Sequence, residues 1–165
     1  MNIKTLSLLT VAAMGALLAA CGSAPMNAPK TMSAFSQAAL SAAVQVPAGH
    51  RVVLETVGAG DITYECRDAA NAAGQYEWVF AGPNAGLADR QGRSIGRYFG
   101  PPATWAASDG SAITGTQIAV APAGDGNIPL QLVKANPASG QGVMSGISHI
   151  QRVATRGGVA PSSVC

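Results

Sequence analysis

The sequence is poor in the residues that build metal and nucleic-acid sites. It holds only two histidines and three cysteines among 165 residues, so a complete set of zinc ligands is hard to assemble. No polybasic patch stands out, and beyond Lys4 the chain carries nine basic against eight acidic side chains. A nearly neutral domain lacks the positive surface that nucleic acid requires. We therefore expect no metal, no cofactor and no nucleic-acid partner.

The N-terminal residues are predicted to be a targeting segment rather than part of the fold. Lys4 precedes an apolar run over 6–18 that is too short and too rich in Ala and Gly for a comfortable membrane span. The run ends in Leu-Ala-Ala-Cys at 18–21, which resembles a bacterial lipobox and predicts a signal peptide over 1–20, with palmitate and other acyl chains on Cys21. Ordinary cleavage with a free thiol is the alternative.

The residues after the lipobox cysteine predict the location of the protein. Gly and Ser follow Cys21, and no Asp does. In bacterial lipoproteins this pattern implies sorting to the outer membrane rather than the inner one. We therefore expect a protein of the bacterial cell envelope, anchored to the membrane through its lipid, with its domain facing the periplasm or the cell surface.

Lipidation of one cysteine leaves two, Cys66 and Cys165, for a disulfide. In an oxidising periplasm two remaining cysteines are expected to pair; free or metal-bound thiols are the alternative. Ile62, Tyr64 and Cys66 alternate with polar residues, which places them on one face of a strand and predicts that the bridge is buried. The bridge would fix the C-terminus to that strand.

The rest of the sequence separates into a short tether and one domain. Residues 21–43 comprise the lipidated cysteine and an unpatterned, Pro-punctuated tether, in which the Ala-rich stretch 33–44 is either a short helix or extended linker. Residues 44–165 are long enough to bury a core, and we expect them to form a single β-rich domain.

Apolar alternation and turn residues predict about eight short strands after residue 44. Two are expected at 51–57 and 61–66, joined by a hairpin turn at 58–60, and a third at 76–81 is expected to end at 82–84. The others are predicted at 87–89, 94–99, 104–107, 111–120, 128–135 and 143–153, with hairpin turns at 90–92 and 108–110. Short, evenly spaced strands and no long helix are typical of an antiparallel sandwich or small barrel, so the predicted fold class is all-β with one disulfide.

Two patterns suggest a hydrolase, and neither is compelling. Residues 92–96 match G-x-S-x-G, but the following Arg-Tyr-Phe-Gly-Pro-Pro cannot begin the helix that a nucleophile elbow needs, so we interpret the match as chance. Ser111, Asp109 and His149 are a possible dispersed set, although turn chemistry around an Asp-Gly pair explains the first two equally well. We expect a non-enzymatic protein that serves in envelope structure or binds a partner or small ligand, with a hydrolase-like site near these three residues as the alternative.

Tyr98, Phe99 and Trp105 are the candidate binding residues. In a small β domain such aromatic residues are first of all core residues. Here the Pro-Pro pair at 101–102 lies between them, and prolines hold neighbouring rings in place at little entropic cost. The alternative to a core role is that these rings line a groove at one end of the sheet, where a protein partner or a small apolar ligand binds.

Six blocks of sequence, taken in order, resemble one family. They are VPAGH (46–50), ITYEC (62–66), EWVFAGPNAGLAD (77–89), GRYFGPPATWAASDGS (96–111), NIPLQLVKA (127–135) and ISHIQRVATRGGVAPSSVC (147–165). Together they resemble the domain-of-unknown-function family numbered 3455, whose members are secreted or lipid-anchored. The resemblance implies an extracytoplasmic β-rich domain with no assigned activity and no established catalytic residues. Tyr98 and Leu130 stand where the family commonly has His and Trp, which further lowers the expectation of an enzyme.

Overall fold

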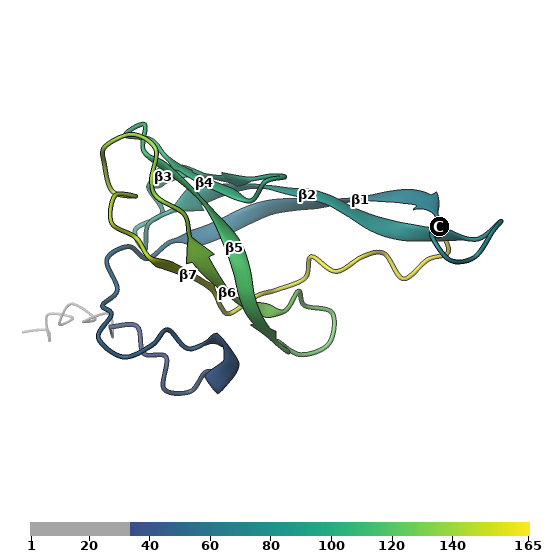
Figure 1. Cartoon of the computed structure of the whole chain (residues 1–165), viewed down its shortest axis with the longest axis horizontal. Helices are drawn as coiled ribbons and strands as arrows, with labels where there is room; N and C mark the ends of the chain where they lie inside the picture. Colours follow the sequence, from purple (N-terminus) through teal and green to yellow (C-terminus); the bar gives the residue numbers. More distant parts are fainter. Residues whose placement is uncertain (1–33) are drawn as a thin grey trace, which may run out of the picture. The chain divides into compact units, whose positions relative to one another are not determined.

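The computed structural model describes residues 34–165, and the prediction of an all-β class is confirmed. One antiparallel sheet contains β1 (Val57–Asp68), β2 (Tyr76–Ala88), β3 (Ser94–Phe99), β4 (Thr104–Ala107), β5 (Ala112–Ala121), β6 (Leu130–Ala135) and β7 (His149–Arg152) (Figure 1). Each strand pairs with the next along the chain. Within the described residues β1 does not pair with β7, so seven strands form an open sheet rather than a closed sandwich or barrel of eight.

The long β1–β2 hairpin contradicts one predicted hairpin turn and one predicted strand end. Residues 58–60 lie inside β1, where Gly58 pairs with Leu87, and residues 82–84 lie inside β2. Gly60, one of the glycines that suggested a turn, serves another purpose in the strand. A Cβ on Gly60 would overlap the carbonyl oxygen of Asn84 on the neighbouring strand, so the glycine allows two backbones to approach closely.

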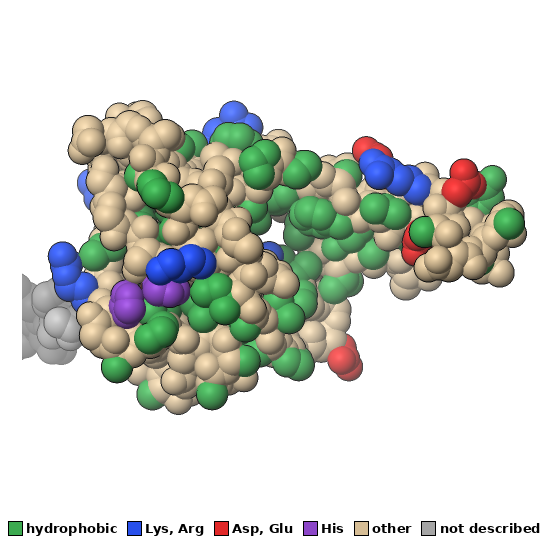
Figure 2. Space-filling model, in the orientation of Figure 1, with side chains coloured by type: hydrophobic (Ala, Val, Ile, Leu, Met, Phe, Trp, Pro, Cys, Tyr) green, Lys and Arg blue, Asp and Glu red, His purple; other side chains and the backbone are tan. Residues whose placement is uncertain are grey.

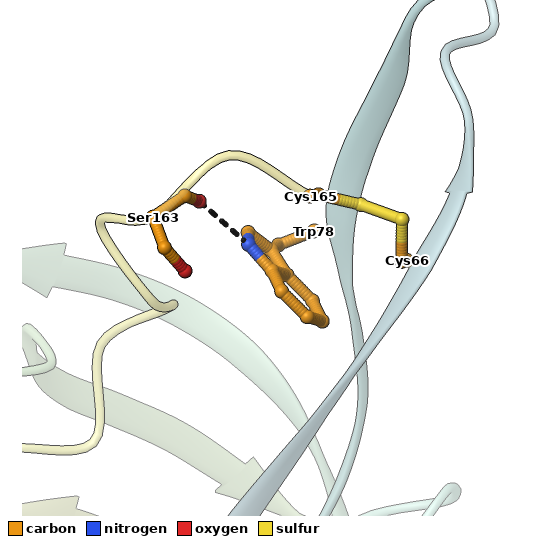
Figure 3. The surroundings of a disulfide bond; sticks show 4 residues. All are labelled: Cys66, Trp78, Ser163 and Cys165. Carbon is orange, nitrogen blue, oxygen red and sulfur yellow. Dashed lines mark hydrogen bonds between the residues drawn. A yellow bond between two sulfur atoms is a disulfide. The ribbon is translucent and has the colours of Figure 1, made fainter.

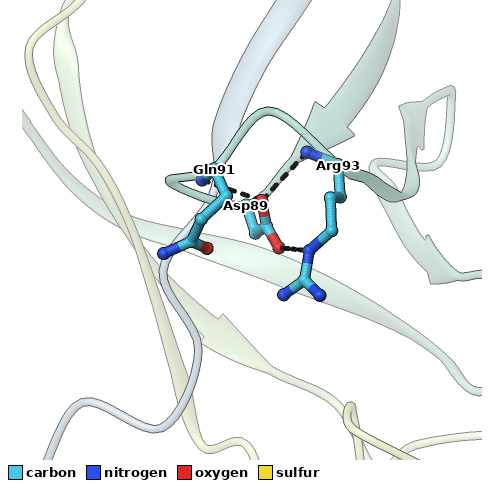
Figure 4. A network of polar contacts seen from close by, with 3 residues as sticks. All are labelled: Asp89, Gln91 and Arg93. Carbon is cyan, nitrogen blue, oxygen red and sulfur yellow. Dashed lines mark hydrogen bonds and ion pairs between the residues drawn. The ribbon is translucent and has the colours of Figure 1, made fainter.

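The two later turns were predicted correctly. Leu87 pairs with Gly96 across the turn at 90–92, and Thr104 pairs with Thr114 across the turn at 108–110. The side chain of Asp89 holds the first turn together, as Figure 4 shows. Its carboxylate accepts the backbone N–H groups of Gln91 and Arg93 at 2.9 Å and the Nε–H of Arg93 at 2.7 Å. These contacts, the backbone bond from Arg93 first among them, hold the pKa of Asp89 below its usual range.

Several other elements are shorter than the sequence predicted. Ser33 lies outside the described residues, and the described part of the stretch, 34–44, contains only the 3-10 turn η1 (Ala42–Val44), whose N-cap residue makes no side-chain hydrogen bond. Strand β6 begins after Pro129, since proline has no N–H for the ladder. The strand predicted at 143–153 is reduced to β7, because a turn precedes it. No helix in residues 34–165 is both long enough and apolar enough to cross a bilayer.

Strand β5 is shared by two parts of the sheet. Its first residues pair with β4, as Thr114 does with Thr104, and its last residues pair with β6, as Ala121 does with Leu130. The register shifts between Gln117 and Ala119, and such an irregularity bends and twists a strand. In Figure 1, β5 and β6 consequently run across the direction of β1 and β2.

A small core lies where η1 meets β5 and β6. Val44, Ala121 and Leu132 are buried there, and Leu40 and Val46 pack around them. Burying a side chain such as that of Leu132 contributes about 1.5–3 kcal/mol. The segment before β1 is thereby packed on the sheet.

The C-terminal segment returns along the β1–β2 hairpin to a disulfide, so the predicted bridge is confirmed (Figures 1 and 3). Cys66 and Cys165 are 99 residues apart in sequence, and their Cα atoms are 5.5 Å apart. The indole Nε1–H of Trp78 donates a hydrogen bond to the carbonyl of Ser163 at 3.0 Å beside the bridge. The prediction of a buried bridge was wrong, because Cys66 is exposed. It pairs with Trp78 in the part of the β1–β2 hairpin that lies past the pairing of β2 with β3.

Candidate functional site

The sheet bends around a cleft of about 350 Å³. Every strand except β4 contributes to its walls, together with the turn after β3 and the loop before β6. The lining residues are Ile62, Tyr64, Phe80, Pro83, Tyr98, Gly100, Pro101, Ala103, Gln117, Val120, Ile128, Pro129, Gln131 and Arg152. The site is therefore assembled by the bend of β5, which brings β6 and β7 opposite β1 to β3.

One wall of the cleft is aromatic. Tyr64 and Phe80 meet edge to face with their ring centroids 6.0 Å apart. The hydroxyl of Tyr64 donates to the carbonyl of Gly158 at 2.8 Å, which fixes this ring against the C-terminal segment. Phe80 remains 54% exposed, although it is an apolar side chain inside a cleft. The wall thus presents a large apolar surface that the rest of the domain leaves open to solvent.

Only one of the three predicted binding aromatics lines the cleft. Tyr98 does so, and its ring stacks on that of Trp105, 4.7 Å away at an interplanar angle of 21°. Trp105 is a support for Tyr98 rather than a part of the wall. Phe99 follows Tyr98 along β3 and points to the opposite face, where the guanidinium of Arg97 lies 5.9 Å from its ring centroid. The structure therefore does not bring the three rings together in one groove.

Among the described residues that line the cleft, Arg152 alone has a charged side chain. Its Nε and Nη2 groups donate to the carbonyl of Pro129 at 3.1 and 2.9 Å. Burial lowers the pKa of Arg152 from its ordinary value, and burial raises the pKa of Tyr98. No carboxylate in residues 34–165 lies within ion-pair distance of Arg152. The cleft therefore combines apolar walls with one cation that has no acidic partner.

Ser111 and Asp109, two of the three residues proposed for a hydrolase-like site, form a structural hydrogen-bond network. The Ser111 side chain is fully buried; its Oγ donates to Asp109 at 2.6 Å and accepts the backbone N–H of Met144 at 3.2 Å. The other carboxylate oxygen of Asp109 accepts the N–H of Val143 at 2.8 Å. The Ser111 hydroxyl is the main reason that the pKa of Asp109 lies below its usual range. This network holds the loop before β7 and leaves the Ser111 hydroxyl inaccessible to a substrate.

His149, the third member, has different neighbours. Its Nδ1 lies 3.0 Å from the Oγ of Ser148, and its ring meets that of His50 edge to face at 4.8 Å; Figure 2 shows the two histidines side by side. Burial, followed by the charges of Lys134 and His50, lowers the pKa of His149. No hydrogen bond among the described residues joins His149 to Asp109 or Ser111, so the three are not arranged as a triad.

We expect Ser111→Ala to lower the free energy of unfolding by about 1–3 kcal/mol, because the buried N–H of Met144 then loses its acceptor. Urea denaturation of both proteins measures the difference. Ser108→Ala, in the same turn but exposed, is the matched control and should change stability by less than about 0.5 kcal/mol. Equal stability of the Ser111 variant and the wild type would contradict a structural role for this hydroxyl.

Several functional predictions fall beyond the cleft. Cys21, the signal peptide over 1–20 and most of the tether lie outside the described residues. Within residues 34–165 no group of three or more His, Cys, Asp or Glu side chains is arranged to hold a metal ion.

Phe80 and Arg152 line the cleft but were not predicted as site residues. Each lies in a strand that was expected, and only the pairing of the strands brings them to Tyr98.

Comparison with known proteins gives one family and no closer relative. No curated protein and no solved structure matches the chain significantly. A protein-family match covers residues 47–165, which include all seven strands and both bridged cysteines. The resemblance noted in the sequence is thereby confirmed, and the chain belongs to the family described as proteins of unknown function, DUF3455.

Proposed function

We propose that this protein is a non-enzymatic, ligand-binding lipoprotein of the outer membrane, and that its β domain holds a small apolar ligand in the cleft beside Tyr98. The observation that carries the proposal is the exposed Phe80 ring within a concave, mostly apolar site. A volume of about 350 Å³ falls within the range of small-molecule sites, roughly 300–1,000 Å³.

The walls of the cleft favour binding because they are preformed. Pro83, Pro101 and Pro129 each contribute to the lining, and proline backbones have little freedom to lose. Tyr98 is backed by Trp105, so its ring also needs little ordering when a ligand arrives. Each Å² of apolar surface that a ligand covers contributes about 25 cal/mol, and a rigid site keeps more of this gain.

A soluble form of the full chain carrying Cys21→Ser, with the neutral probe 2-naphthamide, tests the binding proposal. We expect saturable binding that Phe80→Ala weakens by about tenfold, since one side of the site is removed. Tyr76→Ala is the matched control: Tyr76 is also on β2 and 62% exposed, but it does not line the cleft. Absence of saturable binding, or equal weakening by both substitutions, would overturn the proposal.

The membrane anchor is a separate part of the proposal and rests on the lipobox-like residues before Cys21. Cells that express the chain and receive labelled palmitate should yield a labelled protein in the outer-membrane fraction. Cys21→Ser should abolish the label, because the acyl chains have no attachment point. A labelled Cys21→Ser protein would contradict the assignment.

A further inference from the structure

We propose that the ligand of this cleft carries a single carboxylate, which pairs with the guanidinium of Arg152. This inference rests on the proposed function, because it specifies the chemical class of a ligand for the same site. It is carried by three features of the cleft: the donors that Arg152 leaves open, the absence of acidic residues in the lining, and the position of the Tyr98 hydroxyl.

The guanidinium of Arg152 is held in a fixed orientation, but not all of its N–H groups donate hydrogen bonds to the described residues. A guanidinium has five N–H donors in one plane, and two of them are used on the Pro129 carbonyl. These two bonds fix the plane of the group at the cleft. No acceptor for the other three is found among the described residues. A fixed planar fork with free donors matches the two oxygens of a carboxylate.

The charge of Arg152 is also uncompensated. Among the described residues no Asp or Glu lines the cleft, and the ionisable groups that interact with the guanidinium are the phenols of Tyr98 and Tyr64. A neutral apolar ligand would cover this cation without replacing the water that it displaces, which is unfavourable. A carboxylate removes that penalty, so the site should discriminate by charge.

The remaining lining limits the ligand to one negative charge. Arg152 is the only cation there, and the Tyr98 hydroxyl, which has no hydrogen-bond partner among the described residues, is a second, neutral donor. The volume of about 350 Å³ has room for roughly a dozen non-hydrogen atoms at the ~30 Å³ that each water occupies in the liquid. A bicyclic aromatic acid or a medium-chain fatty acid fits both limits.

The test compares 2-naphthoate with 2-naphthamide, a neutral molecule of nearly the same shape, on the full chain carrying Cys21→Ser. We expect 2-naphthoate to bind at least tenfold more tightly, measured as Kd by isothermal titration calorimetry. Arg152→Gln should remove this preference while 2-naphthamide binding is kept. Arg156→Gln, an exposed arginine four residues along the chain and outside the lining, should leave the preference unchanged.

Each outcome decides a different claim. Equal affinities of the two probes for the unsubstituted cleft, or a preference that survives Arg152→Gln, would overturn the carboxylate inference while the apolar site stands. Binding of neither probe would overturn the proposed function and this inference together. If Arg152→Gln fails to fold, a salt titration on the unsubstituted cleft decides: the preference for 2-naphthoate should shrink as NaCl rises, and a preference independent of salt would contradict an ion pair.

Discussion

Removal of the Cys66–Cys165 disulfide is expected to lower the free energy of unfolding by about 2–5 kcal/mol. The bridge joins residues 99 apart, so it closes most of the domain into one loop and restricts the unfolded chain strongly. It also holds the C-terminal segment, whose other contacts with the hairpin include single hydrogen bonds from Tyr64 and Trp78. A loss of this size is a large part of the stability of a small domain.

The double substitution Cys66→Ser/Cys165→Ser tests this expectation without leaving one partner of the bridge as an unpaired thiol. Guanidinium denaturation measures the change, and hydrogen exchange should rise in the residues after β7. Reduced wild-type protein is a second preparation that should give the same loss. A double variant within about 0.5 kcal/mol of the oxidised protein would show that the bridge adds little to the fold.

Gly82→Ala is expected to cost about 1–3 kcal/mol and to impair ligand binding as well. An added Cβ would overlap the carbonyl oxygen of Gly100 and lie 3.2 Å from Cδ of Pro101. The obstructing atoms belong to backbone and a proline ring, so the turn after β3 must move. Gly100, Pro101 and the neighbouring Pro83 line the cleft, and a shift of the turn therefore changes its shape.

Gly86→Ala provides the matched control on the same strand. The nearest atom to its Cβ is the carbonyl oxygen of Ala59 at 3.9 Å, which is ordinary contact. This variant should keep its ligand affinity and change stability by less than about 0.5 kcal/mol. Similar behaviour of the Gly82 and Gly86 variants in denaturation and in 2-naphthoate titration would contradict the close packing of β2 against the turn.

Local signals allowed part of the fold to be predicted from the sequence. The turns at 90–92 and 108–110 are specified by residues within them, as the contacts of Asp89 illustrate. The error at 58–60 has a physical origin, because glycine is suited both to tight turns and to close approach of two strands. Only the partner strand, with the carbonyl of Asn84 against Gly60, distinguishes these two uses.

The binding site was less predictable than the fold class, since its residues are distant in sequence. Tyr98 was identified from the neighbouring prolines. Phe80 lies in the same cleft because β2 pairs with β3, whereas Arg152 of β7 reaches the cleft through the bend in β5. No local pattern specifies that bend. The disulfide was predictable by counting cysteines, but its exposure depends on how far the β1–β2 hairpin extends past the other strands.

The most direct test of the account is to locate a bound ligand in the protein itself. Titration of the isotope-labelled full chain carrying Cys21→Ser with 2-naphthoate, followed by NMR, reports which groups the ligand contacts. We expect intermolecular contacts to the rings of Phe80 and Tyr98 and a shift of the Arg152 Nε–H resonance, with no change at Tyr76 or His149. Saturable binding with contacts elsewhere, and none to Phe80 or Tyr98, would contradict it.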